Sequence, residues 1–166
     1  MTLRLILMRH AKSSWENPTS GDHERPLAPR GQRSAKALGG WMRDKGWLPD
    51  QILCSSARRT RETLDGLGLD VSAEYLDDLY HASATQMLRM LGQASGKNLL
   101  MIGHNPGISD FADQIVDDPP EHPKFDTFPT GATLVVDFQT DDWSAAGWRG
   151  GLVRDFVVPR DLPGAS

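Results

Sequence analysis

The sequence has few of the features that mark secreted, membrane or nucleic-acid-binding proteins. It contains a single cysteine, Cys54, in 166 residues, so no internal disulfide can form, and a reducing cytoplasm is the expected compartment. Its longest apolar runs are far shorter than the roughly 20 residues that span a bilayer. The net charge of −4 argues against a basic surface for nucleic acid. We therefore expect a cytoplasmic protein with no nucleic-acid or membrane partner.

Strand and helix patterns alternate along the chain. This alternation is typical of a three-layer α/β sandwich with a mainly parallel central sheet flanked by helices. The last two strands lack a helix between them, which predicts an antiparallel strand at one edge. We expect a single domain over residues 1–166, with a flexible tail at 159–166. The predicted strands are 3–8, 51–54, 74–76, 99–102, 132–138 and 151–158, and the predicted helices lie within 29–45, 55–67, 84–93 and 107–116.

Basic side chains follow three of the predicted parallel strands. Arg9 and His10 come directly after the first strand, Arg58 and Arg59 follow the second, and His104 follows the fourth. Ligands bind beyond the carboxyl ends of parallel strands, so these groups are expected to meet. Arginines grip phosphoryl oxygens in pairs, and helix N-termini add positive potential. The pattern predicts a phosphate pocket that takes one of the two adjacent arginines, because helix geometry turns neighbouring side chains in different directions.

Histidine in such a pocket is a plausible nucleophile towards phosphorus, provided that its ring is neutral. Neighbouring arginine cations disfavour a second positive charge and so favour the neutral ring of His10. The same cations would stabilise the charge on the phosphoryl oxygens during transfer. This chemistry requires no metal and no cofactor.

Three motifs, in this order, resemble the signatures of the histidine phosphatase superfamily, whose fold is phosphoglycerate mutase-like. They are "LMRHAKSSW", "SSARRTRET" and "IGHNPG". The short chain and the first and third motifs are most similar to the bacterial phosphohistidine phosphatase branch. The resemblance runs from Leu3 to about Val158.

The resemblance implies a role for each matching residue. His10 would accept the phosphoryl group, and Arg9 would bind it. Arg59 fits an Arg-x-x-x-Thr pattern and would bind phosphate, as would His104, which would also stabilise the transition state. Ser13 is a further candidate phosphate ligand from the loop after the first strand, although a local turn hydrogen bond accounts for it equally well.

One expected feature of that family is missing. Relatives that act on alkyl phosphates use a glutamate after the third strand to protonate the departing oxygen, and "LDDLYHAS" here contains none. Asp78 and His81 are the candidate acids. An imidazole leaving group needs such an acid less, so the gap favours phosphohistidine. We expect a metal-independent phosphatase acting on a phosphohistidine-containing protein; the alternatives are a phosphatase for small phosphate esters and a non-catalytic phosphate-binding module.

Two other chemistries are weighed against this hypothesis. A cysteine phosphatase would use a Cys-x5-Arg loop, but the position five intervening residues after Cys54 is Thr60. A metal hydrolase could draw on His104, Asp110 and Asp113. The proline-rich stretch 117–129 could cover part of the pocket mouth, and the loop histidines His23 and His122 are expected in solvent.

Overall fold

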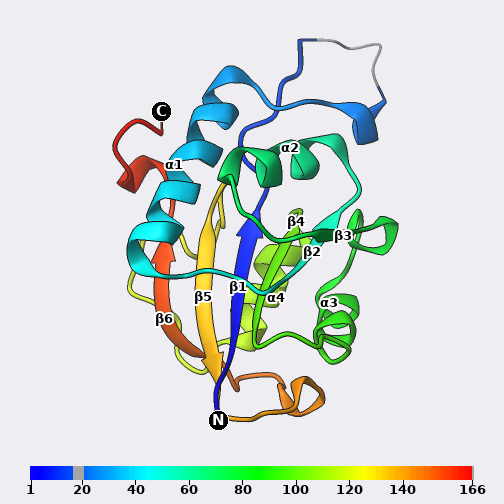
Figure 1. The fold of residues 1–166 in the computed structure, drawn as a ribbon, viewed down its shortest axis with the longest axis vertical. Helices are drawn as coiled ribbons and strands as arrows, with labels where there is room; N and C mark the ends of the chain where they lie inside the picture. Colours follow the sequence, from blue (N-terminus) through cyan, green and yellow to red (C-terminus); the bar gives the residue numbers. More distant parts are fainter. Residues whose placement is uncertain (17–20, 166) are drawn as a thin grey trace.

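A six-stranded sheet forms the centre of the computed structural model, which describes residues 1–16 and 21–165 (Figure 1). The strand order is β3-β2-β4-β1-β5-β6. The predicted strands are all present, with ends displaced by at most one residue. Their bounds are β1 Leu3–Arg9, β2 Gln51–Ser55, β3 Ala73–Leu76, β4 Asn98–Gly103, β5 Thr133–Phe138 and β6 Leu152–Val157.

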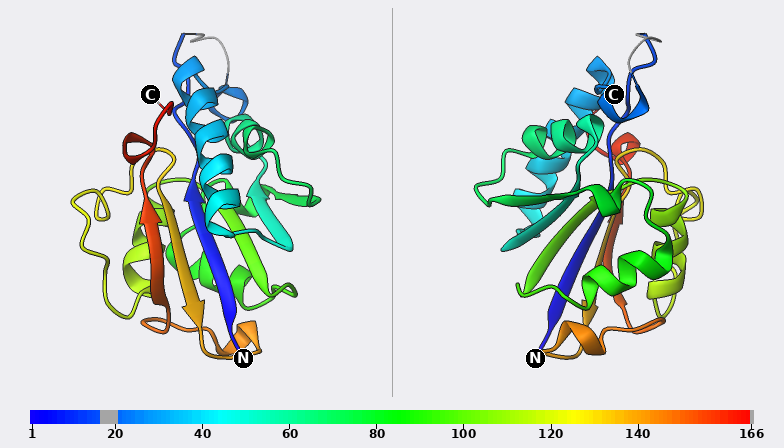
Figure 2. Two further views of the ribbon diagram at one scale, coloured as in Figure 1. Left: turned by 60° about the vertical axis from the view of Figure 1, so that its left-hand side comes forward. Right: turned by 90° about the vertical axis from the view of Figure 1, so that its right-hand side faces the viewer.

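Two pairs of helices cover the two faces of this sheet (Figure 2). α1 (Pro29–Lys45) and α2 (Arg58–Leu67) pack on one face, and α3 (Ala84–Leu91) and α4 (Gly107–Ile115) pack on the other. Each face has its own apolar core cluster. None of the helices in the described ranges has the length and apolar character needed to cross a bilayer.

Strand direction places the site. β1, β2, β3 and β4 pair in parallel, whereas β5 is antiparallel to both β1 and β6. The predicted mainly parallel sandwich with antiparallel pairing near one edge is therefore confirmed. β1 is buried on both faces, which explains its near-continuous apolar run. The carboxyl ends of β1, β2 and β4 lie at one edge of the sheet.

The segment after β6 packs against α1. It forms a short 3-10 helix, η4 (Pro159–Asp161). The Ser34 hydroxyl of α1 donates to the Ala165 carbonyl over 2.8 Å, and Ala165 is 1% exposed. This segment, for which the sequence predicts a flexible tail, thus has a buried anchor at Ala165. Ser166 lies outside the described residues.

α1 and α2 meet at a glycine. A Cβ atom at Gly39 would lie 2.2 Å from the Leu67 carbonyl oxygen, whereas a Cβ at the neighbouring Gly40 would meet nothing within 4 Å. The two helices therefore approach as closely as they do because position 39 has no side chain.

We predict opposite effects of alanine at these two adjacent positions. Gly40→Ala should raise the free energy of unfolding by about 0.5–1 kcal/mol, because alanine is the better helix former. Gly39→Ala should lower it by about 1–3 kcal/mol, because the helices must separate. Urea unfolding of both variants checks this; equal stabilisation by both would mean that the two helices are not in tight contact there.

Candidate functional site

The nucleophile candidate sits immediately after β1. His10 is 5% exposed, and its Nδ1 atom lies 2.7 Å from the Ala11 carbonyl oxygen. A carbonyl can only accept, so Nδ1 carries the proton and Nε2 keeps a free lone pair. The position of His10 is set by backbone bonds, in which its amide donates to Gly103 of β4 and its carbonyl accepts from Gly131.

The second motif lies on α2, and Thr63 of that helix connects it to the loop that follows His10. The Thr63 hydroxyl donates to the Arg59 carbonyl over 2.7 Å and accepts from the Ala11 amide over 3.0 Å. Arg59 is 5% exposed and points into the site. Arg58 is exposed and pairs with Glu62 one turn along, so the structure places the two arginines as the sequence predicts.

His104 enters the site from the end of β4. Its ring centroid lies 5.2 Å from that of His10, and its Nε2 lies 2.8 Å from the Ser55 hydroxyl. Ser55 ends β2, so neighbouring parallel strands hold this contact together. Arg9 completes the group, and its guanidinium donates to the Phe128 carbonyl over 3.2 Å. Phe128 is the next-to-last residue of the proline-rich stretch 117–129, which therefore forms part of the site wall at this point.

Arg25 is a site residue that the sequence reasoning missed. Its guanidinium donates to the Ser13 hydroxyl, lies 3.7 Å from the Trp15 ring centroid and pairs with Asp22 over 3.3 Å. Its charge is among those that lower the pKa of His10. Arg25 lies in a polar loop with no strand end or helical period, so no sequence pattern indicated where its side chain would go. Ser13, the predicted phosphate ligand, lies against this cation.

Asp22 and Tyr80 were missed as well. Asp22 belongs to the 3-10 turn η1 (Asp22–Glu24); it accepts from Arg59 at its carboxylate (3.1 Å) and at its backbone carbonyl (2.8 Å). The Tyr80 hydroxyl donates to the same carboxylate. That hydrogen bond, followed by the Arg59 and Arg25 charges, lowers the pKa of Asp22 to about 2. His23, expected in solvent, is partly buried against the Tyr80 ring.

The structure separates the two candidate acids. The His81 ring packs 4.0 Å from the Tyr80 ring, and His81 lines the same surface hollow as His104. Asp78 lines a different hollow, with Gln51 and Met90. His81 therefore lies next to the phosphate-site candidates, and Asp78 faces elsewhere.

The site is positively charged and its histidines are neutral. Burial, with the charges of Arg9, Arg59 and Arg25, lowers the pKa of His10 to about 3. Burial, with the neighbouring His10 and Arg59, lowers that of His104 to about 2. Several buried nitrogens in the described structure have no hydrogen-bond partner, which is unusual for native proteins: the Nε atoms of Arg9, Arg25 and Arg59 and the Nδ1 of His104. Such a donor set suits a multiply charged anion.

The geometry gives less support to a cysteine phosphatase or a metal hydrolase. Cys54 is fully buried in the core cluster under α1 and α2, and this burial raises the pKa of its thiol to about 12. A protonated, inaccessible thiol is a poor nucleophile. Among the residues that the structure describes, no group of three or more His, Cys, Asp or Glu side chains is placed to hold a metal ion.

A protein-family model matches residues 5–87 of the chain, and its family is the histidine phosphatase superfamily (branch 1). The chain belongs to the histidine phosphatase superfamily. The matched region carries the first two motifs and the loop with Asp22 and Arg25. By its family, the chain is therefore a phosphatase-type protein.

Individual relatives agree with this assignment. An uncharacterised protein of Mycobacterium tuberculosis is 41% identical over 107 residues, which cover 63% of this chain and 67% of that protein. A candidate phosphohistidine phosphatase SixA from Nakamurella multipartitia is 29% identical, with a TM-score of 0.84 over 96% of this chain and 97% of its own. Another from Agrobacterium tumefaciens is 26% identical, with a TM-score of 0.77 over 95% and 99%. The fold is therefore shared with these two structures over nearly the whole of each chain.

We predict that the two histidines make stability depend on pH. Because folding lowers their pKa from 6.5 to about 3 and about 2, the unfolded chain binds more protons between these values. Stability is thus complete above pH 6.5 and falls as the pH drops below it, on the order of 2 kcal/mol per histidine by about pH 4.5. The carboxylate of Asp22 contributes only at lower pH, since its unfolded pKa is 3.8.

Urea unfolding at about pH 7 and pH 4.5 measures this loss. His104→Gln should reduce it, because one of the two titrating rings is gone. The assignment of buried neutral rings is wrong if the wild type and the variant lose the same free energy over this range.

Proposed function

We propose that this chain is a metal-independent phosphatase that hydrolyses phosphohistidine on a protein partner, with the phosphoryl group carried in between on Nε2 of His10. One observation carries the proposal. His10 is a buried neutral imidazole with Nδ1 bonded to the Ala11 carbonyl and Nε2 free, and it stands among arginines whose Nε donors are unpaired. A neutral nucleophile beside arginine cations that keep free Nε donors is what attack on a dianionic phosphoryl group requires.

In the first step, the Nε2 lone pair of His10 forms a bond to phosphorus while the P–N bond of the substrate breaks. The substrate imidazole leaves with the electron pair of that bond, already protonated on its other nitrogen. The His10 ring then carries positive charge, which the Ala11 carbonyl stabilises through its bond to Nδ1–H. Arg9, Arg59 and the His104 Nδ1, where it bears a proton, would bind the phosphoryl oxygens.

In the second step, water attacks phospho-His10. The electron pair of the P–N bond returns to Nε2, and inorganic phosphate forms with the oxygen of that water. The neutral His10 ring is regenerated without any proton having to be added to it. The arginine side chains supply the positive charge that a metal ion would otherwise provide, so the cycle needs no metal.

The substrate class follows from the proton donors at the site. Asp22 is the carboxyl group that touches Arg59, and its pKa of about 2 makes it a carboxylate that cannot protonate an alkoxide at neutral pH. An imidazole leaving group does not need that proton. The resemblance to structures described as phosphohistidine phosphatases supports the same substrate. His81 is the residue to examine first if alkyl esters are also cleaved.

The experiment that tests the proposal compares two substrates. We expect kcat/KM for a phosphohistidine peptide to exceed that for a matched phosphoserine peptide by about 10²-fold or more, because general acid catalysis of alkoxide departure is commonly worth about 10²–10⁴-fold. A chelator should leave the rate unchanged. Preference for the phosphoserine peptide would contradict the substrate assignment.

His10→Ala separates an enzyme from a phosphate-binding module. Turnover of the phosphohistidine peptide should fall to background in this variant while the circular dichroism spectrum stays that of the wild type. Acid-labile labelling of the wild type on His10, seen by mass spectrometry after rapid quenching at alkaline pH, would identify the intermediate. Unchanged turnover in His10→Ala would remove His10 as the nucleophile.

Adjacent arginines provide a second, internally controlled prediction. Arg59→Ala should lower kcat by about 10²–10³-fold, because a buried donor to the transferring phosphoryl group is lost. Arg58→Ala should change kcat by no more than about twofold, because Arg58 is exposed and pairs with Glu62. Comparable losses in the two variants would show that the wrong arginine has been placed in the site.

A further inference from the structure

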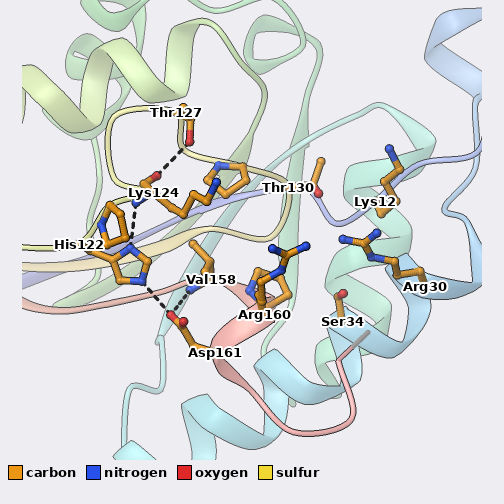
Figure 3. Close-up of a pocket in the computed structure, with 13 residues that line it drawn as sticks. Lys12, Arg30, Ser34, His122, Lys124, Thr127, Thr130, Val158, Arg160 and Asp161 are labelled. Carbon is orange, nitrogen blue, oxygen red and sulfur yellow. Dashed lines mark hydrogen bonds and ion pairs between the residues drawn. The ribbon is translucent and has the colours of Figure 1, made fainter.

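Another cavity, separate from the two hollows that His81 and Asp78 line, lies beside the phosphate site. We call this cavity the basic pocket, and Figure 3 shows the residues that line it. Its volume is about 340 Å³. Its charged walls come from four separate parts of the chain, and its apolar walls come from prolines and a valine. The cations in its lining are Lys12, Arg30, Lys124 and Arg160, and the apolar residues include Pro123, Pro129, Val158 and Pro159.

The cations of the basic pocket are not neutralised. Within the described residues, the side chains of Lys12, Arg30, Lys124 and Arg160 make no ion pair or hydrogen bond, and all four are exposed. The acid in the lining, Asp161, already binds His122 over 2.9 Å and the Val158 amide over 3.2 Å. This concentration of positive charge occurs in a chain whose net charge is −4.

Arg30 lies where stability alone would favour an acid. It is in the first turn of α1, which carries no acidic residue and whose N-cap makes no side-chain hydrogen bond. The positive end of a helix dipole favours negative side chains and disfavours cations there. The unpaired amides of this helix end therefore add to the positive potential of the basic pocket.

The basic pocket and the phosphate site share a wall. Lys12 is two residues beyond His10, and its backbone packs against Gly31 at the start of α1, where a Cβ would lie 2.0 Å from the Lys12 carbonyl oxygen. On the other side, the Phe128 carbonyl accepts from Arg9, and the Gly131 amide donates to the carbonyls of Arg9 and His10. A polypeptide bound at His10 can therefore extend its neighbouring residues into the basic pocket.

We infer that the basic pocket binds acidic side chains next to the phosphohistidine of a protein substrate, an inference that rests on the proposed function. Four cations from four segments, separated by prolines and Val158, suit a stretch of chain that carries more than one carboxylate. The apolar walls would contact the methylene groups and backbone of that stretch. Charge complementarity of this kind acts on recognition and association more than on the chemical step.

Two phosphohistidine peptides test the inference, one with glutamates and one with glutamines beside the phosphohistidine. The wild type should give a higher kcat/KM for the acidic peptide, by about 3- to 10-fold at low salt. Arg30→Gln combined with Arg160→Gln should bring this ratio close to one, and raising the ionic strength to about 0.5 M should do the same in the wild type. Arg33→Gln is the matched control, because Arg33 is an exposed cation on α1 that does not line the pocket, and it should keep the wild-type ratio.

Binding to His10→Ala separates a failure of this inference from a failure of the proposed function. The unphosphorylated acidic peptide, followed by fluorescence anisotropy, should bind this variant more tightly than the glutamine peptide does, and the double substitution should remove the difference. If neither phosphohistidine peptide is turned over but this difference in binding remains, the proposed function is wrong, whereas binding of acidic side chains in the basic pocket is supported. A ratio near one in the wild type, or a ratio unchanged by the double substitution, would overturn the inference.

Discussion

The hydrogen bond from Nδ1 of His10 to the Ala11 carbonyl is the contact on which the chemistry of the site depends. It assigns the proton to one ring nitrogen and leaves the lone pair of the other free. The peptide that accepts this bond is itself held, because its amide donates to the Thr63 hydroxyl. Thr63 also bonds the Arg59 carbonyl, so one side chain of α2 links the peptide that holds the nucleophile to the backbone of Arg59.

Bringing three guanidinium groups together has an electrostatic cost, which Asp22 partly offsets. Burial, and the charge of Arg59, lower the pKa of Arg9, which shows that its cationic form is disfavoured there. The Asp22 carboxylate contacts both Arg59 and Arg25, and Tyr80 holds it in place. An anion that enters the site therefore contacts arginines of which two, Arg59 and Arg25, already pair with the exposed Asp22 carboxylate.

The residues on regular elements could be predicted from the sequence, and those on loops could not. Apolar runs locate β1, β2 and β4, and parallel pairing then brings Arg9, His10 and His104 to one edge of the sheet. Arg59 could be distinguished from Arg58 because Arg59 and Thr63 fit the Arg-x-x-x-Thr pattern of the family that the sequence resembles. Asp22 and Arg25 lie in a stretch without periodicity, and Tyr80 follows the 3-10 turn η2 (Asp77–Leu79). In such a turn each position faces a different direction, so the sequence could not show that His81 rather than Asp78 lies beside His104.

The burial of Cys54 has a practical consequence. It is the single cysteine of the chain, it is enclosed between the sheet and two helices, and its thiol ionises only near pH 12. Maleimide and similar reagents attack thiolates, so the native chain offers them almost no target. A cysteine introduced at any exposed position would then be the one reactive thiol of the molecule. Fluorophores or spin labels could thus be attached at chosen points around the site without first removing a native residue from the core.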